Sequence, residues 1–118
     1  MKAKEAIARY KAENDSALDK DAVLRFLEEV ERLIYTEVVL DFECGEELQP
    51  MMEETVLIAS GAYESLYVHW LAAQTAFVLH EYEKYTVSMQ LFNEYYEKFV
   101  RWYVRNHTNG GKHKFTGF

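Results

Sequence analysis

The sequence predicts an all-α protein, a small antiparallel bundle of three to four main helices followed by an extended C-terminal tail. Apolar residues recur at the three-to-four-residue spacing of one helix face through residues 21–42, 62–82 and 81–106. The main interruption is residues 43–61, which hold the only Pro and two of the five Gly. We therefore expect helices on both sides of one irregular connection, within which residues 55–59 are the candidate for a short strand.

Size and composition indicate a single folded domain. A chain of 118 residues suits one domain that buries about two-thirds of its unfolded surface. Its 49% apolar and 15% aromatic content argues against a disordered chain. We expect residues 1–107 to form the helical domain and residues 108–118 a flexible or partner-docking tail.

Charge and targeting signals exclude several function classes. The formal net charge is −7, and no basic stripe precedes the last ten residues, which argues against a protein that binds nucleic acid by neutralising phosphates. The N-terminus has no apolar signal-peptide core, and the apolar runs are too short to span a bilayer. We expect a soluble intracellular protein with no membrane partner.

The first two helices are expected in residues 2–14 and 21–42. In the first helix, Ala3, Ile7 and Tyr10 lie on one side. Asp19 or Asp21 is expected to cap the second, because a carboxylate accepts hydrogen bonds from the free N–H groups of a first turn. The apolar stripe of the second helix consists of Val23, Phe26, Leu27, Val30, Leu33 and Ile34.

Beyond Ile34 this stripe continues onto Glu37. In one interpretation burial simply fades there, and the carboxylate meets water. In the other, Glu37 faces a basic residue of a neighbouring helix or subunit, because buried charges persist only when they are paired.

The candidate strand "TVLIA" at residues 55–59 has no second strand beside it in an otherwise helical chain. An isolated strand is not stable on its own. If it forms, we expect it to pair with another subunit or with the C-terminal tail.

The last two helices follow each other without Gly or Pro. Either one helix of about 44 residues covers both, or a turn lies near residues 79–84. The turn is favoured, because helices in ordinary domains average about 11–12 residues. The final helix has a heptad-like seam. This seam consists of Tyr85, Met89, Phe92, Tyr96, Phe99 and Tyr103.

Three further aromatic residues, Tyr82, Tyr95 and Trp102, lie off that seam. A stripe this wide has two explanations. Either the final helix is central in its own bundle, or another chain covers one side of it.

The motifs that carry enzyme chemistry are incomplete. His80-Glu81 would need a second His four residues after the first, but position 84 is Lys. His69, beside Trp70, is typical of a hydrogen-bonded histidine at the edge of a core. Cys44 has no base next to it in sequence. We therefore expect no catalytic, metal or cofactor site, and a protein that is not an enzyme.

Two blocks resemble a family of small proteins from tailed bacteriophages and prophages, the head–tail connector (adaptor, or head-completion) proteins. The blocks are "FLEEVERLIYTEV" and "LYVHWLAAQTAFVLHEYEKYTVSMQLFNEYYEKFVRWYVR". Together they place the resemblance over residues 20–106. The first block matches the family pattern at Leu27, Glu29, Val30, Glu31, Ile34, Thr36, Glu37 and Val38. The second matches at Tyr67, Leu71, Ala73, Glu81, Tyr82, Lys84, Tyr85, Ser88, Met89, Phe92, Asn93, Trp102 and Tyr103.

The chain departs from the family pattern at the expected turn. Relatives often carry Asn-Gly just before the Glu-Tyr pair, whereas this chain has Leu79-His80. Histidine tolerates the left-handed backbone region better than most residues.

The resemblance implies a structural subunit that forms an oligomeric ring, expected to be twelvefold, in the virion neck. It implies portal protein on one side and a tail, stopper or tail-terminator protein on the other. DNA would pass through the lumen without specific binding, and the subunit would be made in the bacterial host cytoplasm. The alternative is a small cytosolic helical bundle that acts as a protein–protein interaction or regulatory module.

Six residues are candidates for the partner or oligomer interface. They are Glu37, Tyr82, Tyr95, Trp102, Phe115 and Phe118. The two phenylalanines belong to the tail "NGGKHKFTGF", which either is a frayed terminus or docks on the portal or a neighbouring ring, for example by adding a strand to a sheet edge.

Overall fold

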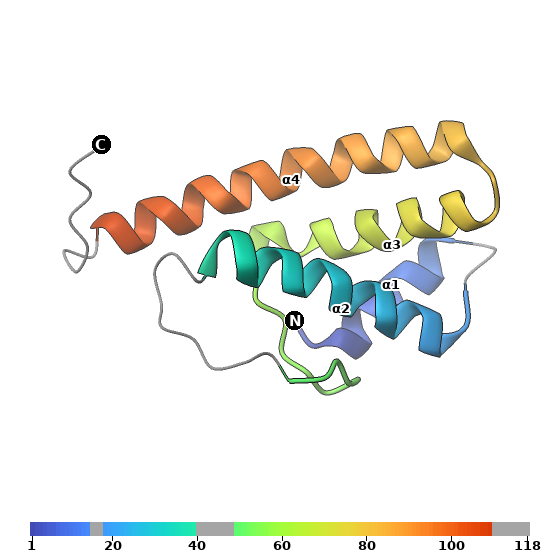
Figure 1. Ribbon diagram of the computed structural model, residues 1–118, viewed down its shortest axis with the longest axis horizontal. Coiled ribbons are helices and arrows are strands. Elements are labelled where there is room, and N and C mark those ends of the chain that lie inside the picture. The colour runs from blue at the N-terminus through green and yellow to red at the C-terminus, as the bar shows by residue number, and fades with distance from the viewer. Residues whose placement is uncertain (15–17, 40–48, 110–118) are drawn as a thin grey trace.

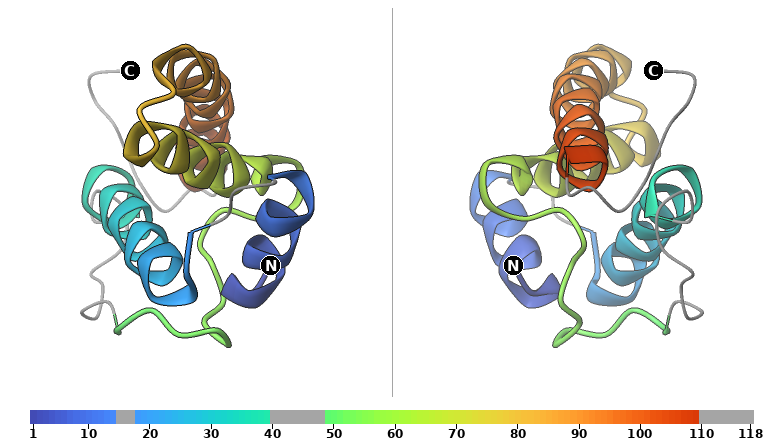
Figure 2. Two further views of the ribbon diagram at one scale, coloured as in Figure 1. Left: turned by 90° about the vertical axis from the view of Figure 1, so that its right-hand side faces the viewer. Right: turned by 90° about the vertical axis from the view of Figure 1, so that its left-hand side faces the viewer.

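The chain forms an antiparallel helical bundle in which α3 is the central helix. The computed structural model describes residues 1–14, 18–39 and 49–109. Its elements are α1 (Ala3–Glu13), α2 (Lys20–Glu37), the short 3₁₀ helix η2 (Gly61–Tyr63), α3 (Ser65–Val78) and α4 (Tyr82–Asn109). Helix α3 contacts α4 on one side and both α1 and α2 on the other (Figures 1 and 2). The predicted all-α bundle is confirmed.

Helix α1 buries one side, as its sequence predicts. Ala3, Ala6, Ile7 and Tyr10 are all buried. The Tyr10 hydroxyl is hydrogen-bonded to the Thr75 hydroxyl of α3, and it also accepts a hydrogen bond from the N–H of Leu18 at 3.0 Å. Tyr10 therefore fastens α1 to α3 and to the start of the next connection.

Helix α2 begins where the sequence predicts but ends earlier. Of the two candidate caps it is Asp19 that acts, because its Oδ1 accepts from the N–H of Ala22 at 2.8 Å. The helix ends at Glu37 rather than continuing to residue 42. Val38 and Val39, just beyond this end, are buried. Both are β-branched and lose little by leaving the helix. Residues 40–42 lie outside the described part of the chain.

Residues 53–57 pair with the N-terminus, and this corrects the expected partners of the candidate strand. Val56 and Lys2 form an antiparallel bridge. The N–H groups of Ala3 and Lys4 donate to the carbonyls of Thr55 (2.8 Å) and Glu53 (2.9 Å). These donors belong to the first turn of α1, which has no intrahelical acceptors for them. The partner in the described part of the chain is thus this chain's own N-terminus, which the sequence analysis did not consider.

Ion pairs hold the same junction together from outside. The ammonium groups of Lys2 and Lys4 both lie 2.9 Å from carboxylate oxygens of Glu54. Lys20, at the start of α2, pairs with Glu53. The segment of residues 49–60 therefore crosses the open side of the α1–α2 pair, opposite α4 (Figure 2).

A tight turn separates α3 from α4, as the helix-length argument predicts. His80 has φ 61°, in the left-handed region. Its N–H donates to the Phe77 carbonyl at 3.1 Å, and the N–H of Glu81 donates to the Ala76 carbonyl at 2.8 Å. This pair of hydrogen bonds is a Schellman motif, in which glycine is the usual left-handed residue. Histidine takes that place here, and the continuous-helix alternative is wrong.

Helix α4 is twice as long as α3, with 28 residues against 14. At ~1.5 Å per residue it is about 42 Å long, and it runs along the 47 Å long axis of the molecule (Figure 1). Its predicted seam faces inward, with Phe92, Phe99 and Tyr103 buried and the other three members half-buried. Helix α4 is not the central helix, because its opposite side is exposed.

Candidate assembly surfaces

The described residues contain no metal-binding cluster. No group of three His, Cys, Asp or Glu side chains in residues 1–14, 18–39 and 49–109 is placed to hold a metal ion. None of the helices in this part of the chain combines the length and the apolar character needed to cross a membrane.

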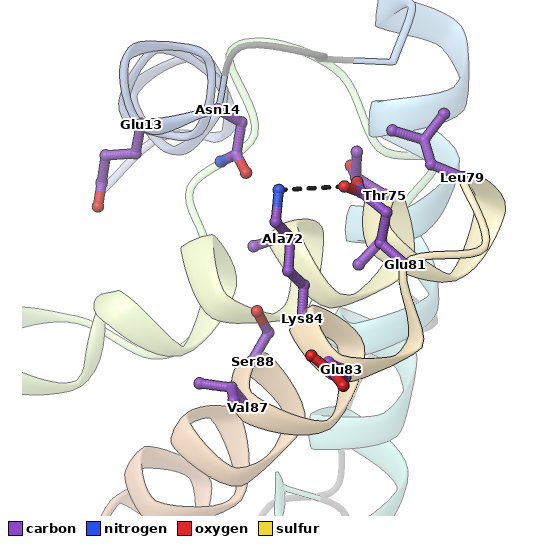
Figure 3. A pocket seen from close by; sticks show the side chains of 11 residues that line it. Glu13, Asn14, Ala72, Thr75, Leu79, Glu81, Glu83, Lys84, Val87 and Ser88 are labelled. Atoms are coloured by element: carbon purple, nitrogen blue, oxygen red, sulfur yellow. Dashed lines mark ion pairs between the residues drawn. The ribbon is translucent and has the colours of Figure 1, made fainter.

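A pocket of about 500 Å³ lies between the end of α1 and the α3–α4 turn (Figure 3). Lys84 of α4 reaches across it and pairs with Glu81 at 3.1 Å. Glu13 and Glu83 add two further carboxylates, and the lining contains neither His nor Cys. The Thr75 hydroxyl is engaged with Tyr10 and with a backbone carbonyl. The pocket is thus an acidic hollow whose one cation, Lys84, is paired with Glu81.

Exposed apolar side chains gather around the α3–α4 turn. We call them the tip patch, and its members are Phe77, Val78, Leu79, Tyr82 and Val87. Tyr82 is 57% exposed, and its hydroxyl lies 2.9 Å from Nδ1 of His80. The rings of Phe77 and Tyr82 meet edge to face, with centroids 6.2 Å apart. Scattered exposed apolar residues are ordinary, but a group at the end of a helical hairpin is typical of an interaction site.

Two of the expected interface residues lie largely within the molecule's own packing. Tyr95 is half-buried, with its ring 5.4 Å from that of His69 on α3. Trp102 is also half-buried, with its ring 5.8 Å from Tyr63 and 6.1 Å from Phe99. Tyr82 alone among the three off-seam aromatics presents most of its surface to solvent. Phe115 and Phe118 lie outside the described residues.

Glu37 meets α4 of its own chain. Its side chain is exposed at the end of α2, and it accepts a hydrogen bond from the Tyr96 hydroxyl. Partial burial, together with this bond to a carboxylate, raises the pKa of Tyr96. The exposed Glu37 side chain agrees with the interpretation in which burial fades at this end of the stripe. The partner of Glu37 within the described chain is a phenol, and not the basic residue of the alternative interpretation.

A shallow groove of about 570 Å³ lies beside this contact, between the end of α2 and α4, and we call it the α2–α4 groove. Its lining consists of Glu37, Val38, Tyr96, Glu97, Val100 and Arg101. The three charged residues are exposed, whereas Val38 is buried and Tyr96 and Val100 are half-buried. The groove therefore has an apolar floor and a charged rim.

A buried polar network joins α2, α3 and the 55–59 segment, and the site predictions missed it. Glu31 is only 4% exposed. Its carboxylate accepts from the Tyr67 hydroxyl (2.7 Å) and from the N–H of Ile58 (2.8 Å), and the same hydroxyl accepts from the N–H of Ala59 (2.9 Å). The sequence contained one signal that Glu31 is buried, because Glu31 lies on the apolar stripe of the second predicted helix, four residues after Leu27.

Burial governs the electrostatics of this network. Loss of hydration raises the pKa of Glu31, and the two hydrogen bonds to the carboxylate only partly oppose that rise. Burial also raises the pKa of Tyr67, and the adjacent Glu31 charge raises it further. Tyr67 therefore stays a hydroxyl donor, and the network fixes the 55–59 segment against the helices.

Comparisons with protein-family models, with curated proteins and with solved structures find no match to this chain.

Proposed function

We propose that this protein is a structural, non-enzymatic subunit of a phage head–tail connector. It assembles into a ring in the virion neck between the portal and a tail, stopper or tail-terminator protein, and the ring leaves a conduit for DNA. The tip patch is the observation that carries this proposal, because it is an apolar surface at the end of a hairpin that the bundle itself does not cover.

The chain offers two different surfaces, as a ring requires. In a cyclic assembly each subunit joins one surface to a different surface of its neighbour. The tip patch lies at the start of α4, and the α2–α4 groove begins 14 positions further along that helix, about 21 Å at ~1.5 Å per residue. One surface projects and the other is concave. This pair supports a head-to-tail contact between copies.

The two sequence blocks that resemble the connector family meet in space. Glu31 belongs to the first block and Tyr67 to the second, and they share the buried hydrogen bond of 2.7 Å. Glu37 and Tyr96, one from each block region, form a second contact. The resemblance therefore coincides with the polar contacts that hold α2 against α3 and α4, which favours a shared architecture.

The charge of the chain suits a conduit. A net charge of −7 gives DNA few phosphate-binding contacts, so DNA slides through the lumen rather than binding to it. A subunit of this kind is made in the host cytoplasm and ends in the virion, and the ring is expected to be twelvefold.

The test is assembly with portal protein. The purified chain, alone and mixed with portal protein from the same phage or prophage, is examined by native mass spectrometry and negative-stain electron microscopy. We expect discrete rings on the portal. We also expect Tyr82→Ser to weaken ring formation and Gln90→Ser, an exposed polar change further along α4, to leave it unaltered. A chain that stays monomeric in the presence of portal protein would refute the proposal.

The α2–α4 groove favours one other candidate function. A half-buried apolar floor with charged rims is typical of sites that take a peptide or helix from a partner. A small cytosolic interaction or regulatory module would use it in this way. Such a module would bind a soluble protein at a ratio of one to one and form no ring.

A further inference from the structure

The α2–α4 groove is an apolar surface with more acidic than basic groups on its rim. The rim contains two carboxylates, Glu37 and Glu97, and one cation, Arg101. None of these three makes an ion pair with another residue in the described part of the chain. The groove therefore fits a short segment that carries both apolar side chains and positive charge.

The chain itself contains such a segment directly after α4. Residues 110–118, "GKHKFTGF" preceded by one further Gly, carry two Lys, one His and two Phe, but no Asp or Glu. The rest of the chain holds the other 11 basic residues and all 20 acidic residues. The tail is thus cationic and aromatic, while the body to which it is attached is strongly acidic.

Chain length places this segment within reach of the groove. Val100 and Tyr96 lie nine and 13 positions before Asn109, which is about 14 and 20 Å along the axis of α4 at ~1.5 Å per residue. If Gly110 and Gly111 reverse the chain, an extended segment after Gly111 runs back along α4 at ~3.3 Å per residue. Phe115 then lies about 13 Å and Phe118 about 23 Å from Gly111. The two aromatic residues then span the groove.

The acidic pocket of Figure 3 is too distant for the same tail. Val87 of its lining is 22 positions before Asn109, or about 33 Å along α4 at ~1.5 Å per residue. That exceeds the reach of the seven residues that follow a reversal at Gly110 and Gly111, about 23 Å at ~3.3 Å per residue. Of the hollows described above, the tail of the same chain can therefore fill only the α2–α4 groove.

We propose that residues 110–118 fold back and occupy the α2–α4 groove of their own chain. Phe115 and Phe118 cover the apolar floor, and Lys112 and Lys114 lie against the carboxylates of Glu37 and Glu97. The free subunit thereby hides the groove with its own C-terminus. This inference stands whether or not the chain is a connector subunit.

Limited proteolysis of the full-length chain tests the contact from both sides. Trypsin cleaves after Lys112 and Lys114 only when the tail is undocked, so the cleavage rate follows the undocked population. We expect two variants to speed this cleavage about tenfold: Val100→Glu, and the double change Phe115→Ser with Phe118→Ser. A tenfold effect corresponds to a wild-type tail that is docked about ten times as often as it is free. Circular dichroism verifies that each variant is folded.

A charge reversal provides a variant that does not disturb packing. Glu97→Lys at the exposed rim should also speed cleavage, by about threefold, and less so at high salt, because screening weakens the attraction. The matched control is Glu83→Lys, the same charge change near the other end of α4, which should leave the rate at the wild-type value. Methyl NMR of the full chain should show Val38 and Val100 shifting in the tail variant, while the core residue Val23 does not.

Two results would overturn the inference. Equal cleavage rates in wild type and in all groove and tail variants would show that the tail does not dock there. Protection that disappears on dilution, in step with loss of a dimer in light scattering, would show that the tail occupies the groove of a second copy.

Discussion

The Tyr67 hydroxyl makes the sharpest stability prediction. Tyr67→Phe leaves the ring in place but removes the oxygen that accepts from Ala59 and donates to Glu31. All three residues are buried. The carboxylate form of Glu31 is more populated at pH 8 than in acid. For that form, an unsatisfied N–H costs about 1–3 kcal/mol and a lost bond to a charged group about 1.5–3 kcal/mol. We expect these two losses together to lower the free energy of unfolding by about 2.5–6 kcal/mol.

The same substitution should cost less in acid. Burial raises the pKa of Glu31 above its ordinary value of 4.5, so at pH 4 the folded protein holds this carboxyl neutral. A lost bond between neutral groups costs about 0.5–1.5 kcal/mol. The total should then be about 1.5–4.5 kcal/mol, which is about 1–1.5 kcal/mol below the cost for the carboxylate form. Urea unfolding at both pH values, followed by circular dichroism at 222 nm, measures the difference.

Tyr10→Phe is the matched control. Tyr10 is as deeply buried as Tyr67, but the hydrogen-bond partners of its hydroxyl among the described residues are the neutral Thr75 hydroxyl and the N–H of Leu18. Its loss should cost about 1–3 kcal/mol, with the same value at pH 4 and pH 8. A cost for Tyr67→Phe below about 1 kcal/mol, or one that does not grow with pH, would refute the role assigned to the Glu31 network.

Substitutions at four other positions have definite expected outcomes. The raised pKa of Glu31 stabilises the wild-type protein below pH 4.5. This stabilisation is lost as the pH rises through the pKa of Glu31 in the folded protein. The difference in free energy of unfolding between wild type and Glu31→Gln, measured by urea titration, should therefore shrink between pH 4 and pH 8. Hydrogen bonds from two lysines lower the pKa of Glu54 to about 2. The small stabilisation from this lowered pKa is present above pH 4.5 and is lost toward pH 2. Glu54→Gln should therefore lower Tm at pH 7 but not at pH 2. His80→Val should cost about 1–2 kcal/mol, and His80→Asn less, because a β-branched residue is strained at positive φ; equal costs would contradict this. Trp102→Ala should cost about 2 kcal/mol, less than the ~3–5 of a fully buried Trp because part of the ring is exposed; an unchanged urea midpoint would place Trp102 outside the packing.

Local features of the chain were predictable from the sequence. Helical periodicity located the four α-helices of the described residues, because the spacing of apolar residues depends only on the pitch of the helix. The cap at Asp19 and the turn at His80 were also within reach, since both are decided by residues adjacent in the chain. The earlier end of α2 was not, because it coincides with the burial of Val38 and Val39, which depends on tertiary packing.

Contacts between distant segments were predictable only in part. The width of the aromatic stripe suggested that α4 was either central or covered by another chain, yet α3 holds the central place. The sequence signal for this is that the segment of α3 is apolar on several sides and rich in small residues. The bridge between Lys2 and Val56 gave no such signal, because a single pair of residues has no periodicity.

By itself, the sequence determined which segments are helical, which face of each is apolar, and that the chain is acidic with a cationic end. The tertiary structure decided that Glu31 is buried against Tyr67, that Trp102 and Tyr95 are half-buried while Tyr82 is exposed, and that α2 and α4 enclose a groove. The physical reason is that periodicity reports how one helix distributes its own side chains. Burial and hydrogen bonding also depend on which other segment comes to lie against them, and that is settled only when the helices pack together.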